Sequence, residues 1–164
     1  MDEPVDVAPE FLARAVELAV ASATDGQQPF GALIVHDGEV LATGVNTVVR
    51  DSDPTAHAEV IAVRTAARRG REVDQPGTVL VSSCEPCPLC EAAAWIVGIS
   101  QIVYAAPKEV ALEHGFRLPE RAARMQAAWR EAAPAGSVRH VPTPGAEEPF
   151  ARFAERGGHA RFLE

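Results

Sequence analysis

Residues 78–91 read Thr-Val-Leu-Val-Ser-Ser-Cys-Glu-Pro-Cys-Pro-Leu-Cys-Glu, which predicts a strand that leads into a helix. The first half of this stretch is apolar and β-branched, which predicts a buried strand over 78–83. The two prolines that follow suit a turn and a first helical position, so a helix is expected through about Val97. Cys87 and Cys90 are three positions apart and share one face of that helix near its N-terminus. The helix dipole and the unpaired N–H groups there favour thiolates.

A second motif, His57-Ala58-Glu59, stands upstream and follows an Asp-Pro-Thr turn. One histidine and two cysteines give zinc three nitrogen and sulfur ligands and leave the fourth tetrahedral position open, as in a catalytic site. His57 and Glu59 can converge only if both project from the N-terminal end of the next helix. We therefore predict one zinc ion per chain, held by His57, Cys87 and Cys90. Glu59 is then the residue that transfers protons beside a metal-bound water.

Simpler interpretations of the same residues stay open. Cys87 and Cys90 could form a structural zinc half-site or a redox pair instead. Glu59 could merely favour the helix N-terminus electrostatically. Cys84 is interpreted as a small buried residue, and the arginines at 64, 68, 69 and 71 as a solvated face. The remaining histidines are interpreted as surface or packing residues: His36, His114, His140 and His159.

The rest of the chain alternates strand and helix patterns, which indicates a layered α/β structure. A helix that opens at Pro9 is closed by Asp25-Gly26. Asp37-Gly38 predicts a hairpin turn, and residues 50–56 a polar loop. Further strands are expected at 30–36, 40–46, 101–105 and 138–141, and further helices at 57–67, 120–132 and 147–155.

Composition is that of a soluble globular protein, with 47% hydrophobic and 23% charged residues among 164. The longest apolar stretch, 92–99, is far too short to cross a bilayer. Three cysteines within 84–90 form no disulfide framework and fit a reducing compartment. The net charge of −8 argues against tight, charge-driven binding to nucleic acid. We expect one domain over 1–164, located in the cytoplasm and not bound to membranes.

The two motifs make the chain resemble the cytidine/deoxycytidylate deaminase superfamily, and within it the bacterial guanine deaminase branch. A histidine-x-glutamate followed by proline-cysteine-x-x-cysteine is the known signature of zinc-dependent nucleobase deaminases. The resemblance runs from about Phe11 to the C-terminus. Its other shared stretches are 29–32, 44–46, 53–59, 83–90, 104–106, 115–116 and 149–150.

The resemblance implies a three-layer α/β/α fold with a five-stranded mixed sheet, one zinc per subunit and a homodimer. It also implies hydrolytic deamination of a free nucleobase with release of ammonia. Asn46 would hydrogen-bond the base, Phe30 would stack near it, and the Ala58 backbone would contact its edge. Residues 142–164 form a C-terminal tail and helix that, in this branch, crosses to the partner and helps to cover the site.

Two departures bear on the substrate. Val110 stands where guanine deaminases carry an acidic residue, with Glu109 and Glu113 nearby as possible substitutes. Ile96 replaces an aromatic residue, and Trp95 lies one position earlier, where it becomes a candidate base contact. Guanine or a related aminopurine or aminotriazine is the favoured substrate. The alternatives are a cytosine-type base deaminase, a tRNA adenosine deaminase that forms inosine, and a non-enzymatic, zinc-stabilised binding module.

Overall fold

A computed structural model describes residues 5–158. Its centre is a five-stranded sheet in the order β2-β1-β3-β4-β5. β1 runs antiparallel to both β2 and β3, whereas β4 runs parallel to both β3 and β5, so the sheet is mixed as predicted. The strands are β1 Gly31–His36, β2 Glu39–Val45, β3 Val79–Cys84, β4 Gln101–Ala106 and β5 Val138–His140.

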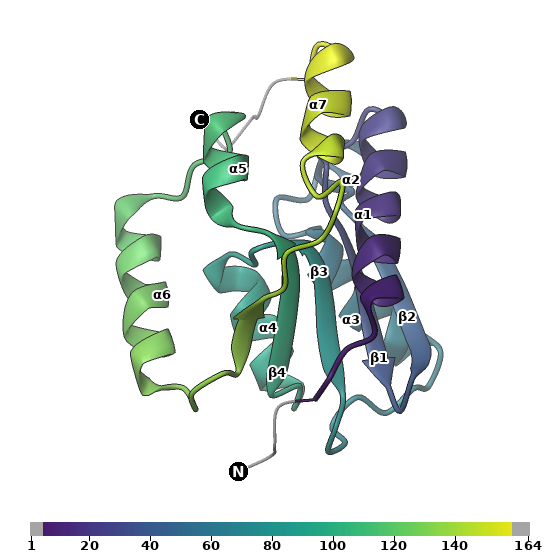
Figure 1. The fold of residues 1–164 in the computed structure, drawn as a ribbon, viewed down its shortest axis with the longest axis vertical. Coiled ribbons are helices and arrows are strands. Elements are labelled where there is room, and N and C mark those ends of the chain that lie inside the picture. The colour runs from purple at the N-terminus through teal and green to yellow at the C-terminus, as the bar shows by residue number, and fades with distance from the viewer. Residues whose placement is uncertain (1–4, 159–164) are drawn as a thin grey trace.

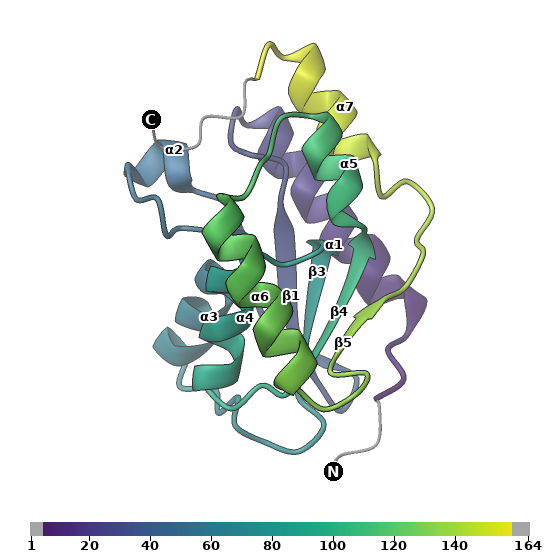
Figure 2. The ribbon, with the colours of Figure 1, turned by 90° about the vertical axis from the view of Figure 1, so that its left-hand side faces the viewer.

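Helices cover both faces of this sheet and make three layers (Figure 1). α1 and α7 lie on one face, while α3 and α4 lie on the other, with α6 packed outside α4 (Figure 2). The longer helices are α1 Pro9–Thr24, α3 Ala58–Arg68, α4 Pro88–Ile96, α6 Glu120–Ala132 and α7 Glu148–Glu155. None of the helices among the described residues has the length and apolarity needed to span a membrane.

Alternating strand residues supply two hydrophobic cores, because successive side chains point to opposite faces of a sheet. Leu33 and Val35 of β1 pack into the core beneath α1 and α7, which includes the fully buried Phe150. Ala32 and Ile34 pack into the core beneath α3 and α4. Both faces of the sheet are therefore closed to water along its central strands.

Two short helices were not predicted. α2 Val48–Asp51 lies at the start of the segment interpreted as a loop, and it ends at Ser52, whose φ is 50°. α5 Lys108–Glu113 follows β4 directly and begins after Pro107. Helices of four and six residues show hardly one repeat of a helical pattern, so hydrophobic periodicity cannot reveal them.

Gly44 of β2 lets the first turns of α3 lie directly against the sheet. A Cβ atom at this position would lie 2.1 Å from the Ala58 carbonyl oxygen and 2.5 Å from the Ala62 amide nitrogen. Both atoms belong to helix backbone, which cannot rotate away as a side chain does. The missing side chain of Gly44 therefore sets the position of the helix that begins with His57 and Glu59.

Replacing Gly44 by alanine is expected to push α3 away from β2 and to lower the free energy of unfolding by about 1–3 kcal/mol, as overpacking does. The displacement would also move His57 and Glu59, so the deaminase activity that the resemblance implies should fall with stability. Urea denaturation measures the first effect and ammonia release the second. Thr43→Ala on the same strand is the control, and equal stability of the two variants would contradict the prediction.

α7 packs on α1 of its own chain and supports an aromatic cluster. The Phe150 ring lies 5.7 Å from that of Phe30 and 6.0 Å from that of Phe116, both in edge-to-face geometry. Phe153 extends the cluster, with its ring 5.5 Å from that of Phe116. The C-terminal helix thus supports two rings that reach the site described next. The end of the predicted tail, 159–164, lies outside the described residues.

Candidate metal and substrate site

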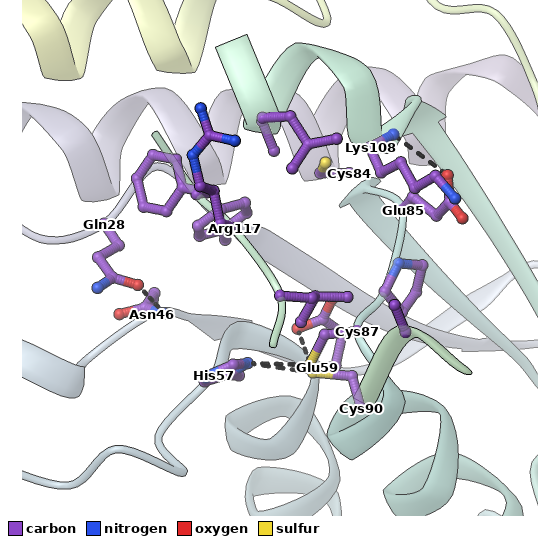
Figure 3. A pocket seen from close by; sticks show the side chains of 17 residues that line it. Gln28, Asn46, His57, Glu59, Cys84, Glu85, Cys87, Cys90, Lys108 and Arg117 are labelled. Carbon is purple, nitrogen blue, oxygen red and sulfur yellow. Dashed lines mark hydrogen bonds between the residues drawn. The ribbon is translucent and has the colours of Figure 1, made fainter. Parts of the chain in front are cut away.

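The N-termini of α3 and α4 face one another and bring His57, Cys87 and Cys90 together. His57 and Cys87 are the N-cap residues of α3 and α4, and Cys90 lies in the first turn of α4. The His57 Nδ1 atom lies 3.5 Å from the Cys87 sulfur and 3.4 Å from the Cys90 sulfur, and the two sulfurs are 3.6 Å apart. Figure 3 shows the three side chains converging on one point.

These separations fit a tetrahedral zinc ion. Zinc–sulfur bonds of about 2.3 Å and zinc–nitrogen bonds of about 2.0 Å place two sulfurs about 3.8 Å apart and a sulfur and a nitrogen about 3.5 Å apart. The observed distances lie within a few tenths of an ångström of these values. No other group of three or more histidine, cysteine, aspartate or glutamate side chains in the described chain is arranged to hold a metal ion. Cys84 lies outside the group, buried at the end of β3.

Glu59 is buried beside this group, in the first turn of α3. One carboxylate oxygen accepts a hydrogen bond of 2.9 Å from the Ser82 hydroxyl, and the other accepts one of 3.2 Å from the Cys90 thiol. Burial raises the pKa of Glu59, and the negative charge on Cys87 raises it further. A carboxyl group with a raised pKa can both accept and release a proton near neutral pH.

The two cysteines differ sharply in acidity. The hydrogen bond between the Cys87 and Cys90 sulfurs, together with the neighbouring His57, lowers the pKa of Cys87 to about 4. The same contact and full burial raise the pKa of Cys90. Burial opposes a charge on His57, but the hydrogen bond and the charge of Cys87 outweigh it and raise the pKa of His57. The site therefore holds a thiolate even before a metal binds.

In the metal-free protein, Cys87 is expected to react with iodoacetamide at pH 6 nearly as fast as at pH 8, because it remains a thiolate above about pH 4. The pKa of Cys84 and that of Cys90 are both raised, so these residues should stay unmodified while the protein is folded. Peptide mass spectrometry measures each rate, and added zinc should protect Cys87. A Cys87 rate that falls tenfold per pH unit below pH 8 would contradict the prediction.

A cavity of about 260 Å³ opens above this group. Phe30 and Asn46, both predicted base contacts, line it, and the Phe30 ring packs edge-to-face on Phe116 at 5.0 Å. The Asn46 side-chain amide donates a hydrogen bond of 3.3 Å to the Gln28 side-chain oxygen. Its own oxygen accepts one of 3.1 Å from the Val48 amide, so the orientation of the Asn46 side chain is fixed.

Trp95, Glu109 and Glu113, the other candidate side chains, do not line this cavity. Trp95 lies near the C-terminal end of α4, where it lines a second hollow and its ring lies 6.3 Å from that of Trp129. It is five residues beyond Cys90, which is about 7.5 Å along a helix. Glu109 and Glu113 are exposed on α5 and are not among the lining residues. Ala58 is fully buried, so only its backbone could serve a substrate.

Sequence reasoning missed several residues that line the cavity. Lys108 and Arg117 contribute two cations, and neither forms an ion pair within the part of the chain that the structure describes. The resemblance offered a signal for four of them, because Phe116 lies in the shared stretch 115–116, and Cys84, Glu85 and Pro86 lie in the shared stretch 83–90. The other missed residues are Gln28, Ala111, Leu112, Leu118 and Ala123.

A five-stranded mixed sheet that presents one histidine and two cysteines from two helix N-termini, with a buried glutamate beside them, defines a zinc-dependent deaminase. The model of the cytidine and deoxycytidylate deaminase zinc-binding region matches residues 6–106. The chain belongs to this family. It is accordingly an aminohydrolase, and zinc is its metal.

Individual proteins of the family are similar to this chain to different degrees. The chain is 44% identical over 107 residues to guanine deaminase of Bacillus subtilis strain 168, and the aligned stretch covers 65% of this chain and 69% of that enzyme. The X-ray structure of Bacillus subtilis guanine deaminase superposes with a TM-score of 0.65 at 34% identity, covering 96% of this chain and 99% of the other.

Two further relatives bear on substrate. The crystal structure of the protein NE0047 in complex with 2,6-diaminopurine superposes on this chain with a TM-score of 0.69 at 25% identity. The superposition covers 98% of this chain and 87% of the other. The tRNA-specific adenosine deaminase of Aquifex aeolicus strain VF5 is 35% identical over 96 residues. That match covers 58% of this chain and 64% of the Aquifex enzyme, slightly under two thirds of its length.

Proposed function

We propose that this protein hydrolytically deaminates a free purine base, guanine or a close aminopurine, and releases ammonia. The observation that carries the proposal is the buried Glu59 carboxylate beside the His57, Cys87 and Cys90 group, at the bottom of a cavity lined by Phe30. The similarity to Bacillus subtilis guanine deaminase and the diaminopurine complex of the solved relative support the choice of a purine.

His57, Cys87 and Cys90 are the proposed zinc ligands. Bound zinc supplies a Lewis acid that lowers the pKa of a coordinated water to about 7. Glu59 then accepts a proton from the attacking water and passes it to the ring nitrogen beside the reacting carbon. Glu59 then moves the proton of the added hydroxyl group to the amino group, the carbon–nitrogen bond breaks, and ammonia leaves as that hydroxyl oxygen becomes the ring carbonyl. Ser82 keeps the carboxylate in place through its hydrogen bond of 2.9 Å.

Asn46 and Phe30 are the proposed base contacts. The Asn46 amide is held in one orientation by Gln28 and Val48, so it can present a fixed hydrogen-bonding edge to the base. Phe30 offers an aromatic surface that Phe116 and Phe150 support from behind. The Ala58 backbone is the third proposed contact, because Ala58 directly follows His57, which lines the cavity. Glu109 and Trp95 stay predictions, since neither is among the residues that line the cavity.

A second candidate function is deamination of adenosine in tRNA, and one observation favours it. Lys108 and Arg117 are exposed, line the cavity and form no ion pair among residues 5–158, so they could contact a phosphate. The Aquifex relative is such a tRNA deaminase. The net charge of −8 weighs against it, since affinity for nucleic acid rests largely on phosphate contacts.

An ammonia-release screen of the purified protein tests these functions against each other. It should cover guanine, 2,6-diaminopurine, adenine, cytosine, aminotriazines, the corresponding nucleosides and a tRNA anticodon stem-loop. The proposal expects turnover of guanine or diaminopurine as free bases. Turnover of cytosine alone would overturn the purine assignment, and inosine formation in the stem-loop alone would establish the tRNA function. If nothing releases ammonia, the non-enzymatic binding module regains support.

We further propose a homodimer located in the cytoplasm. Ile96 is 84% exposed beside the hollow that Trp95, Ile99 and Trp129 line, which leaves an apolar surface for a second copy. Light scattering of the purified protein tests the dimer, and Ile96→Glu should shift it toward a monomer. Exchange of the C-terminal tail stays a prediction, since α7 packs on α1 of the same chain here.

A further inference from the structure

α6 docks on the rest of the molecule through polar rather than apolar side chains. Surface helices ordinarily bury an apolar stripe. The one α6 residue that is buried is Gln126, and the half-buried Trp129 adds an edge-to-face contact with Trp95. The position of this helix therefore depends on the hydrogen bonds that Gln126 and Arg130 make. We refer to these two residues, four apart on one face of α6, as the α6 clamp.

Among the described residues, the side-chain hydrogen bonds of the clamp all go to the segment that carries the two cysteines. The Gln126 amide donates hydrogen bonds of 2.7 Å to the Pro86 carbonyl and of 2.7 Å to the Glu91 carboxylate. The Arg130 guanidinium donates one of 2.9 Å to the same Glu91 oxygen and one of 2.6 Å to Glu85. Pro86 directly precedes Cys87, and Glu91 directly follows Cys90.

The charges make this contact hard to break. The Glu91 side chain is fully buried and that of Glu85 is 7% exposed, so Arg130 supplies the positive charge for two carboxylates that water hardly reaches. Without Arg130, both carboxylates would lose the cation that they contact in the structure. Removing one partner of a buried ion pair is far more damaging than losing an exposed one, because an uncompensated buried charge remains.

Glu85 extends the connection to the substrate cavity. Its second oxygen accepts a hydrogen bond of 3.1 Å from the Lys108 amide at the start of α5. Ala123 of α6 and Leu118, which precedes α6, both line the cavity. The clamp thus connects the metal-binding loop, the start of α5 and the cavity wall that α6 forms.

We propose that Gln126 and Arg130 are positioning residues that hold the Pro86–Cys90 segment in the geometry for zinc and fix one wall of the substrate cavity. This inference rests on the zinc ligands proposed above, and it is independent of which base is deaminated. Groups that hold metal ligands in place typically change metal affinity by about 10–100-fold when they are removed. A comparable loss is expected here.

Zinc affinity measured by competition with a chelator tests the proposal. Arg130→Met should bind zinc about 10–100-fold more weakly than the wild type, and Gln126→Leu about 10-fold more weakly. Arg130→Lys, which keeps the charge but not the planar fork, should recover part of the loss. Arg124→Met is the matched control, since Arg124 is exposed on the same helix and forms no hydrogen bond or ion pair among the described residues.

Absorption spectra of the cobalt-substituted variants separate positioning from simple loss of stability. Altered ligand geometry should shift the cobalt bands of Gln126→Leu and Arg130→Met but not those of Arg124→Met. If Arg130→Met fails to fold, Gln126→Leu carries the test, because it removes hydrogen bonds and no charge. Zinc affinity and spectra of both clamp variants that match those of Arg124→Met would overturn the inference. Neither readout needs turnover, so failure of the proposed deaminase function would leave the inference intact.

Discussion

Replacing Glu59 by glutamine is expected to lower deamination by about 10²–10⁴-fold, the usual contribution of a positioned general acid or base. Zinc content should stay at the wild-type level, because Glu59 is not among the proposed ligands. Ammonia release measures the activity, and elemental analysis measures the metal. Glutamine keeps the size of the side chain and can accept the Ser82 hydrogen bond, so the change removes proton transfer with little change in packing.

Ser82, the hydrogen-bond donor to Glu59, should also contribute to deamination. Ser82→Ala removes the hydrogen bond of 2.9 Å that holds the carboxylate, and it should lower activity by less than Glu59→Gln does. Glu17→Gln, on the exposed face of α1, is the control for loss of a carboxylate in general. Near-wild-type ammonia release by Glu59→Gln would contradict the assignment of Glu59 as the proton shuttle.

The sheet and the metal group could be predicted because their signals are local. Runs of apolar residues between turn residues identified β1, β2, β3 and β4 to within a residue or two. The cysteines and His57 could be placed at helix N-termini because proline and the Asp-Pro-Thr turn mark where those helices begin. A metal group of this kind can be predicted from the spacing of its histidine and cysteines along the chain.

Residues whose roles depend on contacts between distant segments could not be predicted. α6 was predicted correctly as a helix, but its sequence does not reveal that Gln126 would be buried against Pro86 and Glu91. Trp95 and Glu109 were assigned to the base by their positions relative to the deaminase motifs. Neither residue lines the cavity, and Trp95 lines a second hollow instead. Lys108 and Arg117, which do line it, lie at the start of the short α5 and just beyond its end, and hydrophobic periodicity does not predict this helix.

Replacing Cys87 by alanine is expected to abolish zinc binding and, with it, deamination. Two ligands remain in this variant, too few to hold the ion against water. A ligand present at a thousand times its dissociation constant stabilises a folded protein by about 4 kcal/mol, and the variant forgoes this stabilisation. For a chain of this size that corresponds to a melting temperature roughly 10 °C below that of the zinc-loaded wild type.

Cys84→Ala is the matched control, because Cys84 is another cysteine of the same segment, three positions before Cys87. Its sulfur lies outside the metal group and its side chain is buried at the end of β3, so only a packing cost of about 1 kcal/mol is expected. Elemental analysis and thermal unfolding with and without added zinc separate the two variants. Because metal binding is coupled to folding, only Cys87→Ala should unfold at the same temperature in both conditions. Full zinc content in Cys87→Ala together with loss of zinc in Cys84→Ala would contradict the prediction and would identify Cys84 as the zinc ligand in place of Cys87.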